Sequence, residues 1–146
     1  MINNKTITFA WRSLRALCLA YVCAEYGFKV ALIDGPSMKP TLNSNDIVLS
    51  NQWTPIFGNV KRSDIVIFRS PMDPKKFHCK RIKGVEGDYV RRGFSSISIP
   101  KGHVWVEGDN SSHSKDSRDY GPVPIGLIIG VVFFKVYPFI DSKFLS

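Results

Sequence analysis

A serine in a proline-rich turn is the first group in this chain that could do chemistry. Ser37 directly follows Gly35-Pro36 and stands three residues before Pro40. Because proline fixes its own φ and restricts the residue before it, the backbone around Ser37 is partly predetermined. Such a backbone can direct the hydroxyl and the N–H of Ser37 toward one point, as nucleophilic attack with oxyanion binding requires. A rigid proline turn without catalytic function is the alternative.

A lysine in a basic, strand-like segment is the second group. In a strand, Lys80 and Ile82 would share one face, opposite to Arg81. Burial would lower the Lys80 pKa, by about 3–5 units at full burial, and leave a neutral amine able to accept a proton. A basic strand with both faces in water is the alternative, because residues 58–92 hold ten lysines and arginines against four acidic residues.

A polar loop over residues 108–124, rich in Gly, Asp, Asn and Ser, carries the third group. Asp116 and Arg118 could form a bidentate pair that fixes the loop, and Ser114 could form a hydrogen bond near a neighbouring strand. A solvated hydrophilic turn is the alternative.

Short β-strands must position these groups. Runs rich in β-branched residues, flanked by Asn, Gly, Pro and Ser, predict strands at residues 47–50, 64–69, 78–85, 89–91, 104–107 and 127–137. No long helical periodicity follows residue 33. The sequence therefore predicts a mostly β fold: a small domain of antiparallel strands over residues 34–146, arranged as a sandwich or half-barrel.

Residues 1–33 differ from the rest of the chain. Up to Ala24 their only charges are three basic residues, and the apolar run 16–24 is shorter than the roughly 20 residues of a clean spanning helix. Three interpretations are open: a transmembrane or re-entrant anchor with its basic end inside, a mitochondrial import signal, and an amphipathic helix packed on the domain. The helical membrane anchor is favoured.

Composition sets the outer limits. The 146 residues fit one domain, and the net charge of +8 permits nucleic acid or an anionic membrane surface as a partner. Three cysteines without metal-ligand spacing argue against a disulfide framework and a structural zinc site. There is no phosphate-binding motif, and we predict neither a metal nor a cofactor.

Taken together, the three groups resemble the motifs of the type I signal peptidase family (peptidase S26). That family has a nucleophile motif S-M-x-P-T, then K-R-hydrophobic with G-x-x-G-D, then G-D-N with S-x-D-S-R-x-x-G. Order and spacing agree, and the short length, the basic N-terminus and the ending Phe-Phe-Lys-Val-Tyr-Pro resemble the mitochondrial inner membrane branch, subunit 1 type. The matching segments are residues 37–41, 80–82 with 84–88, and 108–110 with 114–121, within a resemblance covering about residues 12–138.

The resemblance implies a membrane-bound serine endopeptidase with a Ser–Lys dyad. Ser37 would be the nucleophile and Lys80 the general base. Ser114 would help to orient the lysine. The Ser37 N–H would bind the oxyanion, but the serine that supplies a second donor in many bacterial relatives is replaced here by Gly35.

The resemblance also implies substrate, partner and location. An extended precursor would pair beside a strand edge near Ser37, and Asp116 and Arg118 would support the loop. Family members of the mitochondrial type remove sorting segments from precursors delivered to the intermembrane space, as heterodimers with a related second subunit. The implied place is the mitochondrial inner membrane, with the catalytic domain facing the intermembrane space. A bacterial inner membrane would fit the chemistry equally well.

Several alternatives stay open. A self-cleaving LexA-type regulator also uses a Ser–Lys dyad, but residues 1–33 are too short for its DNA-binding domain. A non-enzymatic basic β-domain would bind nucleic acid or an anionic membrane. A catalytically silent partner subunit is disfavoured by the intact serine and lysine. A Ser-His-Asp triad would need His78, His103 or His113.

Overall fold

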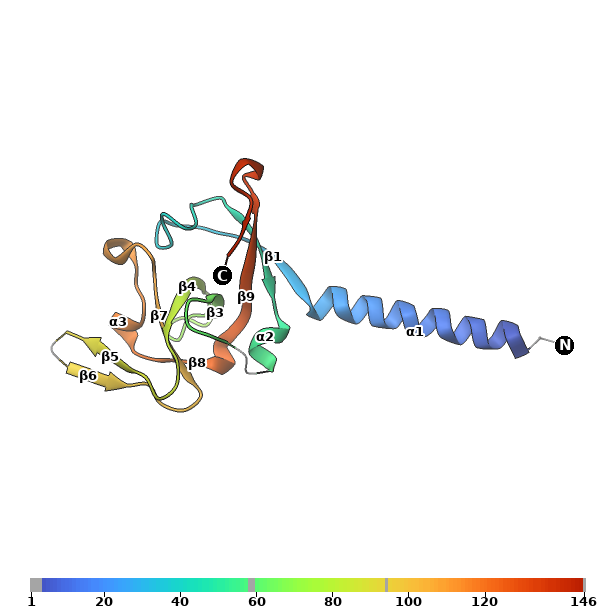
Figure 1. Cartoon of the computed structure of the whole chain (residues 1–146), viewed down its shortest axis with the longest axis horizontal. Helices are drawn as coiled ribbons and strands as arrows, with labels where there is room; N and C mark the ends of the chain where they lie inside the picture. Colours follow the sequence, from blue (N-terminus) through green and yellow to red (C-terminus); the bar gives the residue numbers. More distant parts are fainter. Residues whose placement is uncertain (1–3, 58–59, 94, 146) are drawn as a thin grey trace.

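The computed structural model describes residues 4–57, 60–93 and 95–145. A long N-terminal helix, α1 (Asn4–Tyr26), projects from a domain built mostly of strands (Figure 1). The other α-helices of the described residues, α2 (Trp53–Ile56) and α3 (Ser117–Tyr120), are single turns between strands. Strands and the loops between them therefore position the site.

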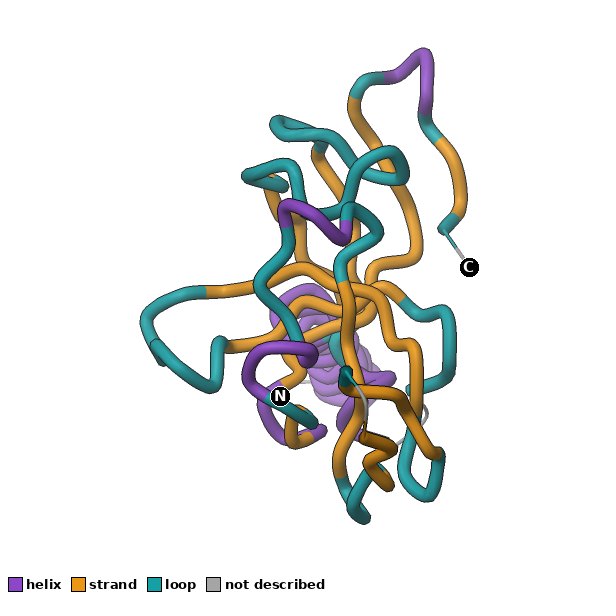
Figure 2. Tube along the Cα trace, turned by 90° about the vertical axis from the view of Figure 1, so that its left-hand side faces the viewer, coloured by secondary structure: helices purple, strands orange, loops and turns teal. Residues whose placement is uncertain are grey.

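The strands of the described residues are all paired antiparallel. The main sheet has the order β1-β2-β9-β3-β4-β7-β8 with β10 added on β9, and β5 and β6 form a separate hairpin. β9 runs on into a C-terminal hairpin that carries the 3₁₀ turn η3 (Phe139–Asp141) at its tip (Figure 2). The strands are β1 (Phe28–Leu32), β2 (Ile47–Asn51), β3 (Ile65–Arg69), β4 (Phe77–Gly84), β5 (Tyr89–Arg92), β6 (Ser95–Ser98), β7 (His103–Glu107), β8 (Val123–Pro124), β9 (Ile128–Tyr137) and β10 (Lys143–Phe144).

The predicted mostly β, antiparallel fold is confirmed. The six predicted strands correspond to β2, β3, β4, β5, β7 and β9, each shifted by no more than one residue at either end. The finer choice of sandwich or half-barrel stays a prediction. Four strands of the structure were not predicted from the sequence: β1, β6, β8 and β10. Of these, β1 lies within residues 1–33 and pairs with β2 in the main sheet. Its apolar run looked like a continuation of the N-terminal segment, and only the pairing with β2 shows that it belongs to the sheet.

The N-terminal segment is helical up to Tyr26, as α1. Within the part of the chain that the structure describes, no helix is both long enough and apolar enough to cross a membrane. Several apolar side chains of α1 are nevertheless open to solvent, so the helix leaves them without cover from the domain; they are Phe9, Trp11, Leu14, Leu17, Leu19, Tyr21 and Val22. The membrane anchor stays a prediction.

The apolar core holds the loop that carries Ser37. In this loop, which joins β1 to β2, Met38 and Leu42 are 1% and 0% exposed and pack with Val48 and Val132 of the sheet. The burial of each such side chain stabilises the folded state by about 1.5–3 kcal/mol. Ser37 is therefore held next to a side chain that is fixed in the core.

Candidate active site

The loop between β1 and β2 places Ser37 against β4. Lys80 Nζ donates a hydrogen bond to Ser37 Oγ over 2.5 Å. Lys80 is 5% exposed and shares its strand face with the fully buried Ile82, while the side chain of Arg81 is 16% exposed. Of the two interpretations left open for this strand, the one with a buried lysine holds at Lys80, and the structure brings together the two residues that the sequence singled out.

Burial controls the protonation of Lys80. Removal from water lowers its pKa below the ordinary value and outweighs the attraction of Asp116, which raises it. Among the described residues no aspartate or glutamate forms an ion pair with Lys80. A larger share of Lys80 is therefore neutral at a given pH than for a lysine in water, as a proton acceptor requires.

The residues of the third group form a hydrogen-bond network that converges on the Asp116 carboxylate. Arg118 binds the fully buried Asp116 in a bidentate manner, through Nε at 2.9 Å and Nη2 at 2.7 Å. The same carboxylate accepts hydrogen bonds from Ser114 Oγ at 2.6 Å and from the Gly108 N–H at 2.9 Å. Burial raises the pKa of Asp116, but these bonds outweigh it and lower the pKa to about 2. The predicted Asp116–Arg118 pair is confirmed.

The hydroxyl of Ser114, which was expected to help orient Lys80, has another observed partner. It donates to Asp116 Oδ2, and the structure gives no hydrogen bond between Ser114 and Lys80 among the described residues. The orientation of Lys80 by Ser114 therefore stays a prediction, with Asp116 as the observed partner of this hydroxyl.

Gly108 and Asn110 hold the nucleophile loop directly. The Asn110 N–H donates to Ser37 O at 3.0 Å, and Asn110 Nδ2 donates to Pro36 O at 3.2 Å. A Cβ atom on Gly108 would lie 2.5 Å from Ser37 O and 2.3 Å from Ser114 Oγ. Only glycine lets the two loops approach this closely. Asn110 was not predicted to be a site residue, although it belongs to the Gly-Asp-Asn motif.

A second set of bonds joins all three motifs. Arg81 binds Asp109 through Nε at 2.9 Å and Nη2 at 2.8 Å, and Thr41 Oγ1 donates to Asp109 Oδ2 at 2.6 Å. Arg81 Nη1 also donates to the Ser63 carbonyl. Sequence reasoning missed these partners, because they lie on β4 and on two separate loops. Thr41, Arg81 and Asp109 stand inside the three motifs, which was the signal that could have identified them, whereas Ser63 stands outside the motifs.

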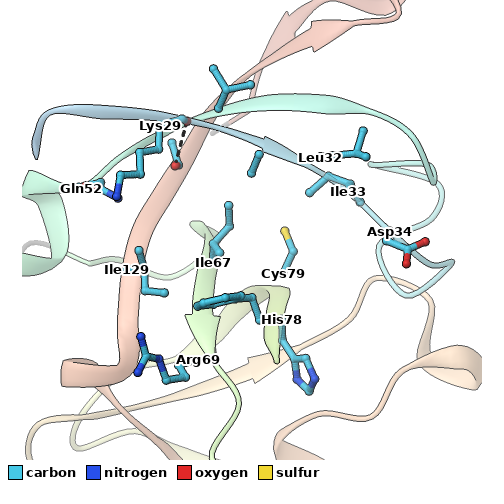
Figure 3. Close-up of a pocket in the computed structure, with 14 residues that line it drawn as sticks. Lys29, Leu32, Ile33, Asp34, Gln52, Ile67, Arg69, His78, Cys79 and Ile129 are labelled. Atoms are coloured by element: carbon cyan, nitrogen blue, oxygen red, sulfur yellow. Dashed lines mark hydrogen bonds between the residues drawn. The ribbon is translucent and has the colours of Figure 1, made fainter. Parts of the chain in front are cut away.

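A groove of about 580 Å³ lies beside β4 and the start of the loop that carries Ser37. It lies between β1 on one side and β3 and β4 on the other, with Lys29 and Gln52 toward one end and Asp34 toward the other (Figure 3). Neither Ser37 nor Lys80 lines it, but it is lined by Asp34, three residues before Ser37, and by Cys79, directly before Lys80. β1 is an edge strand of the main sheet, and therefore has backbone groups available for pairing.

The structure gives the three histidines of the alternative triad no hydrogen bond to Ser37 among the described residues. His103 Nδ1 bonds to the Lys101 carbonyl and His113 Nδ1 to Ser112 Oγ. Burial, followed by the charges of Lys80, Lys76 and Lys115, lowers the pKa of His78.

The described residues contain no cluster of three or more His, Cys, Asp or Glu side chains that could hold a metal ion. Cys18 and Cys79 are free thiols, and burial raises the pKa of Cys79 to about 12.

A comparison with protein families gives this site its context. The family model described as signal peptidase, peptidase S26, matches residues 6–97 and 91–137. The chain belongs to the signal peptidase family, peptidase S26. It is therefore a serine peptidase by family, and the Ser37 and Lys80 motifs both lie within the matched residues.

Named relatives are similar over most of the chain. The mouse protein named mitochondrial inner membrane protease subunit 1 is 45% identical over 99% of this chain and 90% of its own length. The yeast protein named mitochondrial inner membrane protease subunit 2 is 40% identical over 75% of this chain and 68% of its own. A solved signal peptidase I from Enterococcus faecalis is 23% identical, with a TM-score of 0.42 over 49% of this chain and 95% of its own.

Proposed function

We propose that this signal peptidase family member is a membrane-bound serine endopeptidase that removes sorting segments from precursor proteins, with Ser37 as nucleophile and Lys80 as general base. The observation that carries the proposal is the 2.5 Å hydrogen bond from Lys80 Nζ to Ser37 Oγ. Burial lowers the pKa of this lysine, which suits it to accept the serine proton.

Acylation needs a neutral Lys80. Its Nζ takes the proton of Ser37 Oγ as the oxygen attacks the scissile carbonyl carbon and the carbonyl π bond opens to an oxyanion. The Ser37 N–H donates to this oxyanion. When the carbonyl re-forms, the C–N bond breaks and the leaving amine takes the proton from Lys80. The products of this step are an acyl-Ser37 ester, a free amine and a neutral Lys80.

Deacylation repeats the steps with water. Lys80 accepts a proton from a water molecule whose oxygen attacks the ester carbon, and the expelled Ser37 oxygen takes the proton back from Lys80. A second oxyanion donor is not the Gly35 N–H, since this group donates to Ser44 Oγ at 3.2 Å. The Ser37 N–H is the donor that the loop itself provides.

The groove suits an extended polypeptide. A substrate segment that paired with the free edge of β1 would run along the groove toward Ser37, and main-chain hydrogen bonds would supply much of its affinity. Apolar side chains toward the middle, Ile67 and Ile129 among them, would contact alternate residues of that segment. Pairing of an extended segment along a strand edge suits cleavage within a chain, as an endopeptidase requires.

Location and partner rest on the relatives. They are named as mitochondrial inner membrane protease subunits 1 and 2, which supports the inner membrane and a heterodimer with a related second subunit. We further propose that the catalytic domain faces the intermembrane space, as the resemblance to the mitochondrial branch implies. The exposed apolar side chains of α1, together with Arg12 and Arg15, support its role as the membrane attachment. No part of the site requires nucleic acid.

The test is cleavage of a precursor panel in detergent, with and without the candidate second subunit. We expect the wild-type protein to cleave and both Ser37→Ala and Lys80→Met to be inactive while folded. Lys83→Met is the matched control, because Lys83 lies on the same strand and is exposed; it should cleave like the wild type. Turnover retained by either active-site variant would contradict the dyad. A wild type that is inactive under both conditions would favour the silent-subunit interpretation.

A further inference from the structure

A second buried lysine lies on β9, away from Ser37. Lys135 is 0% exposed. Its Nζ lies 2.6 Å from Asp46 Oδ2 and 2.8 Å from Asp141 Oδ2. Asp46 is itself buried, whereas Asp141 sits half-exposed on η3 and also pairs with Lys143 at 3.1 Å. The proposed catalytic steps use none of these groups.

Asp46 links this lysine to the nucleophile loop. The carboxylate oxygen that meets Lys135 also accepts the Asn43 N–H at 2.7 Å. The backbone of Asp46 accepts the Ile33 N–H, and Ile33 in turn accepts the Asn45 N–H, both at 2.8 Å. Ile33 and Asp46 are the two ends of the loop that carries Ser37. Lys135 therefore binds the loop at its base, while Asn110 binds it next to Ser37.

A buried ion pair adds little to the stability of the folded state compared with apolar side chains of the same size. Desolvation offsets most of the attraction between two buried charges, and an apolar pair of similar volume is often as stable or more so. The neighbouring core residues Val48 and Val132 are apolar, so an apolar pair would suit the surroundings. What an ion pair adds is direction: it holds Asp46 at one point, where apolar packing would tolerate displacement.

We propose that Lys135 is a positioning residue, which holds Asp46 and thereby keeps the nucleophile loop where Ser37 Oγ meets Lys80. The proposal rests on the proposed function for its catalytic consequence. Asp141 is the second anchor, so the C-terminal hairpin takes part in holding the loop. Lys135 contacts neither Ser37 nor the groove, and acts only through Asp46.

The test uses a double variant, Asp46→Asn with Lys135→Met. The asparagine oxygen can still accept the Asn43 N–H, and methionine keeps the length of the lysine stem, so mainly the ionic link is lost. The single variant Lys135→Arg keeps the positive charge and should therefore retain cleavage activity. Lys143→Met is the matched control, because Lys143 pairs with the same Asp141 but is half-exposed and does not reach the loop.

We expect the double variant to unfold at nearly the wild-type temperature, while kcat falls roughly ten- to a hundredfold with KM within about twofold. Amide hydrogen exchange should speed up in residues 34–46 and stay unchanged in β3 and β4. Lys135→Arg should retain most of the wild-type kcat, and Lys143→Met should leave kcat unchanged. This pattern separates positioning from general stability, which would change the unfolding temperature and the exchange of all strands.

A double variant with wild-type kcat and wild-type exchange in residues 34–46 would overturn the proposal. So would a double variant that unfolds, since the pair would then act through the stability of the whole domain. If the wild-type protein cleaves no precursor, the proposed function fails, and exchange in residues 34–46 still decides whether Lys135 holds the loop.

Discussion

The two buried lysines of this domain differ in their partners and in the direction in which their pKa values are shifted. Lys80 on β4 is 5% exposed and meets a serine hydroxyl. Lys135 on β9 is 0% exposed and meets two aspartates. Burial lowers the pKa of both, but hydrogen bonds with Asp141 and Asp46 outweigh it at Lys135 and raise the pKa there. The first lysine can be neutral and accept a proton, and the second stays charged and holds a loop.

The difference lies in which carboxylates are available. The carboxylate that attracts Lys80 is Asp116, whose oxygens already accept hydrogen bonds from Arg118, Ser114 and Gly108. No salt bridge to Lys80 forms among the described residues. Asp46 Oδ2 accepts the Asn43 N–H and also lies 2.6 Å from Lys135 Nζ, so this carboxylate carries fewer hydrogen bonds than Asp116 and forms an ion pair with the lysine. Burial thus sets the cost of a charge, and the occupancy of nearby acceptors decides whether that cost is offset.

The sharpest test of this comparison replaces each lysine by methionine. Lys80→Met should lower cleavage by at least about a thousandfold and change the free energy of unfolding by only about 1 kcal/mol, since it removes one hydrogen bond and no ion pair. Lys135→Met should lower the free energy of unfolding by about 3–5 kcal/mol, because Asp46 is left buried without its partner. Denaturant unfolding and cleavage rates measure both effects. Equal destabilisation by the two variants would contradict the comparison.

The second largest effect is expected when the hydrogen-bond network around Asp116 is disrupted. Asp116→Asn removes the charge that Arg118 binds and weakens the bonds from Ser114 and Gly108. We expect cleavage to fall roughly ten- to a hundredfold and the free energy of unfolding to fall by about 1–3 kcal/mol. Both follow from kinetics and thermal unfolding of the purified variant. Unchanged cleavage would show that Lys80 does not need the hydrogen-bonded network around Asp116 in order to act.

Adding one methyl group at the loop contact should have a smaller effect. In Gly108→Ala the new Cβ would meet Ser37 O and Ser114 Oγ well inside normal contact distances. Displacement of the two loops should lower kcat about tenfold and cost about 1–3 kcal/mol of stability. Gly126→Ala is the matched control, because a Cβ there meets no atom within 4 Å. Similar kcat values for the two variants would argue against the close approach.

The smallest expected effect is a change in the pH profile. Cleavage should rise with pH as Lys80 loses its proton, with a midpoint below the ordinary lysine value of about 10.4. Asp116 raises and Arg118 lowers the pKa of Lys80. The midpoint should therefore fall in Asp116→Asn and rise in Arg118→Met. Profiles of kcat/KM over pH measure it, and shifts of the same sign in both variants would refute the electrostatic account.

Local sequence was sufficient for much of the fold and for the two central residues. The strands β2, β3, β4, β5, β7 and β9 follow from runs of β-branched residues between turn residues, which depend on neighbours in sequence. Ser37 and Lys80 stand in motifs whose order and spacing are visible in the chain. β1 was missed because a short apolar run has no alternation to separate it from the segment before it.

What the sequence determined by itself was therefore the residue types, the strands and the three motifs. Tertiary structure decided which charges are offset. Lys135 stands in the run Phe-Phe-Lys-Val-Tyr, where a lysine would be expected to face water, and it is buried only because Asp46 and Asp141 meet it from elsewhere in the chain. Gly108 and Asn110 likewise reach Ser37 across some seventy residues. The electrostatic energy of a buried group depends on such distant neighbours, and their positions are properties of the folded chain alone.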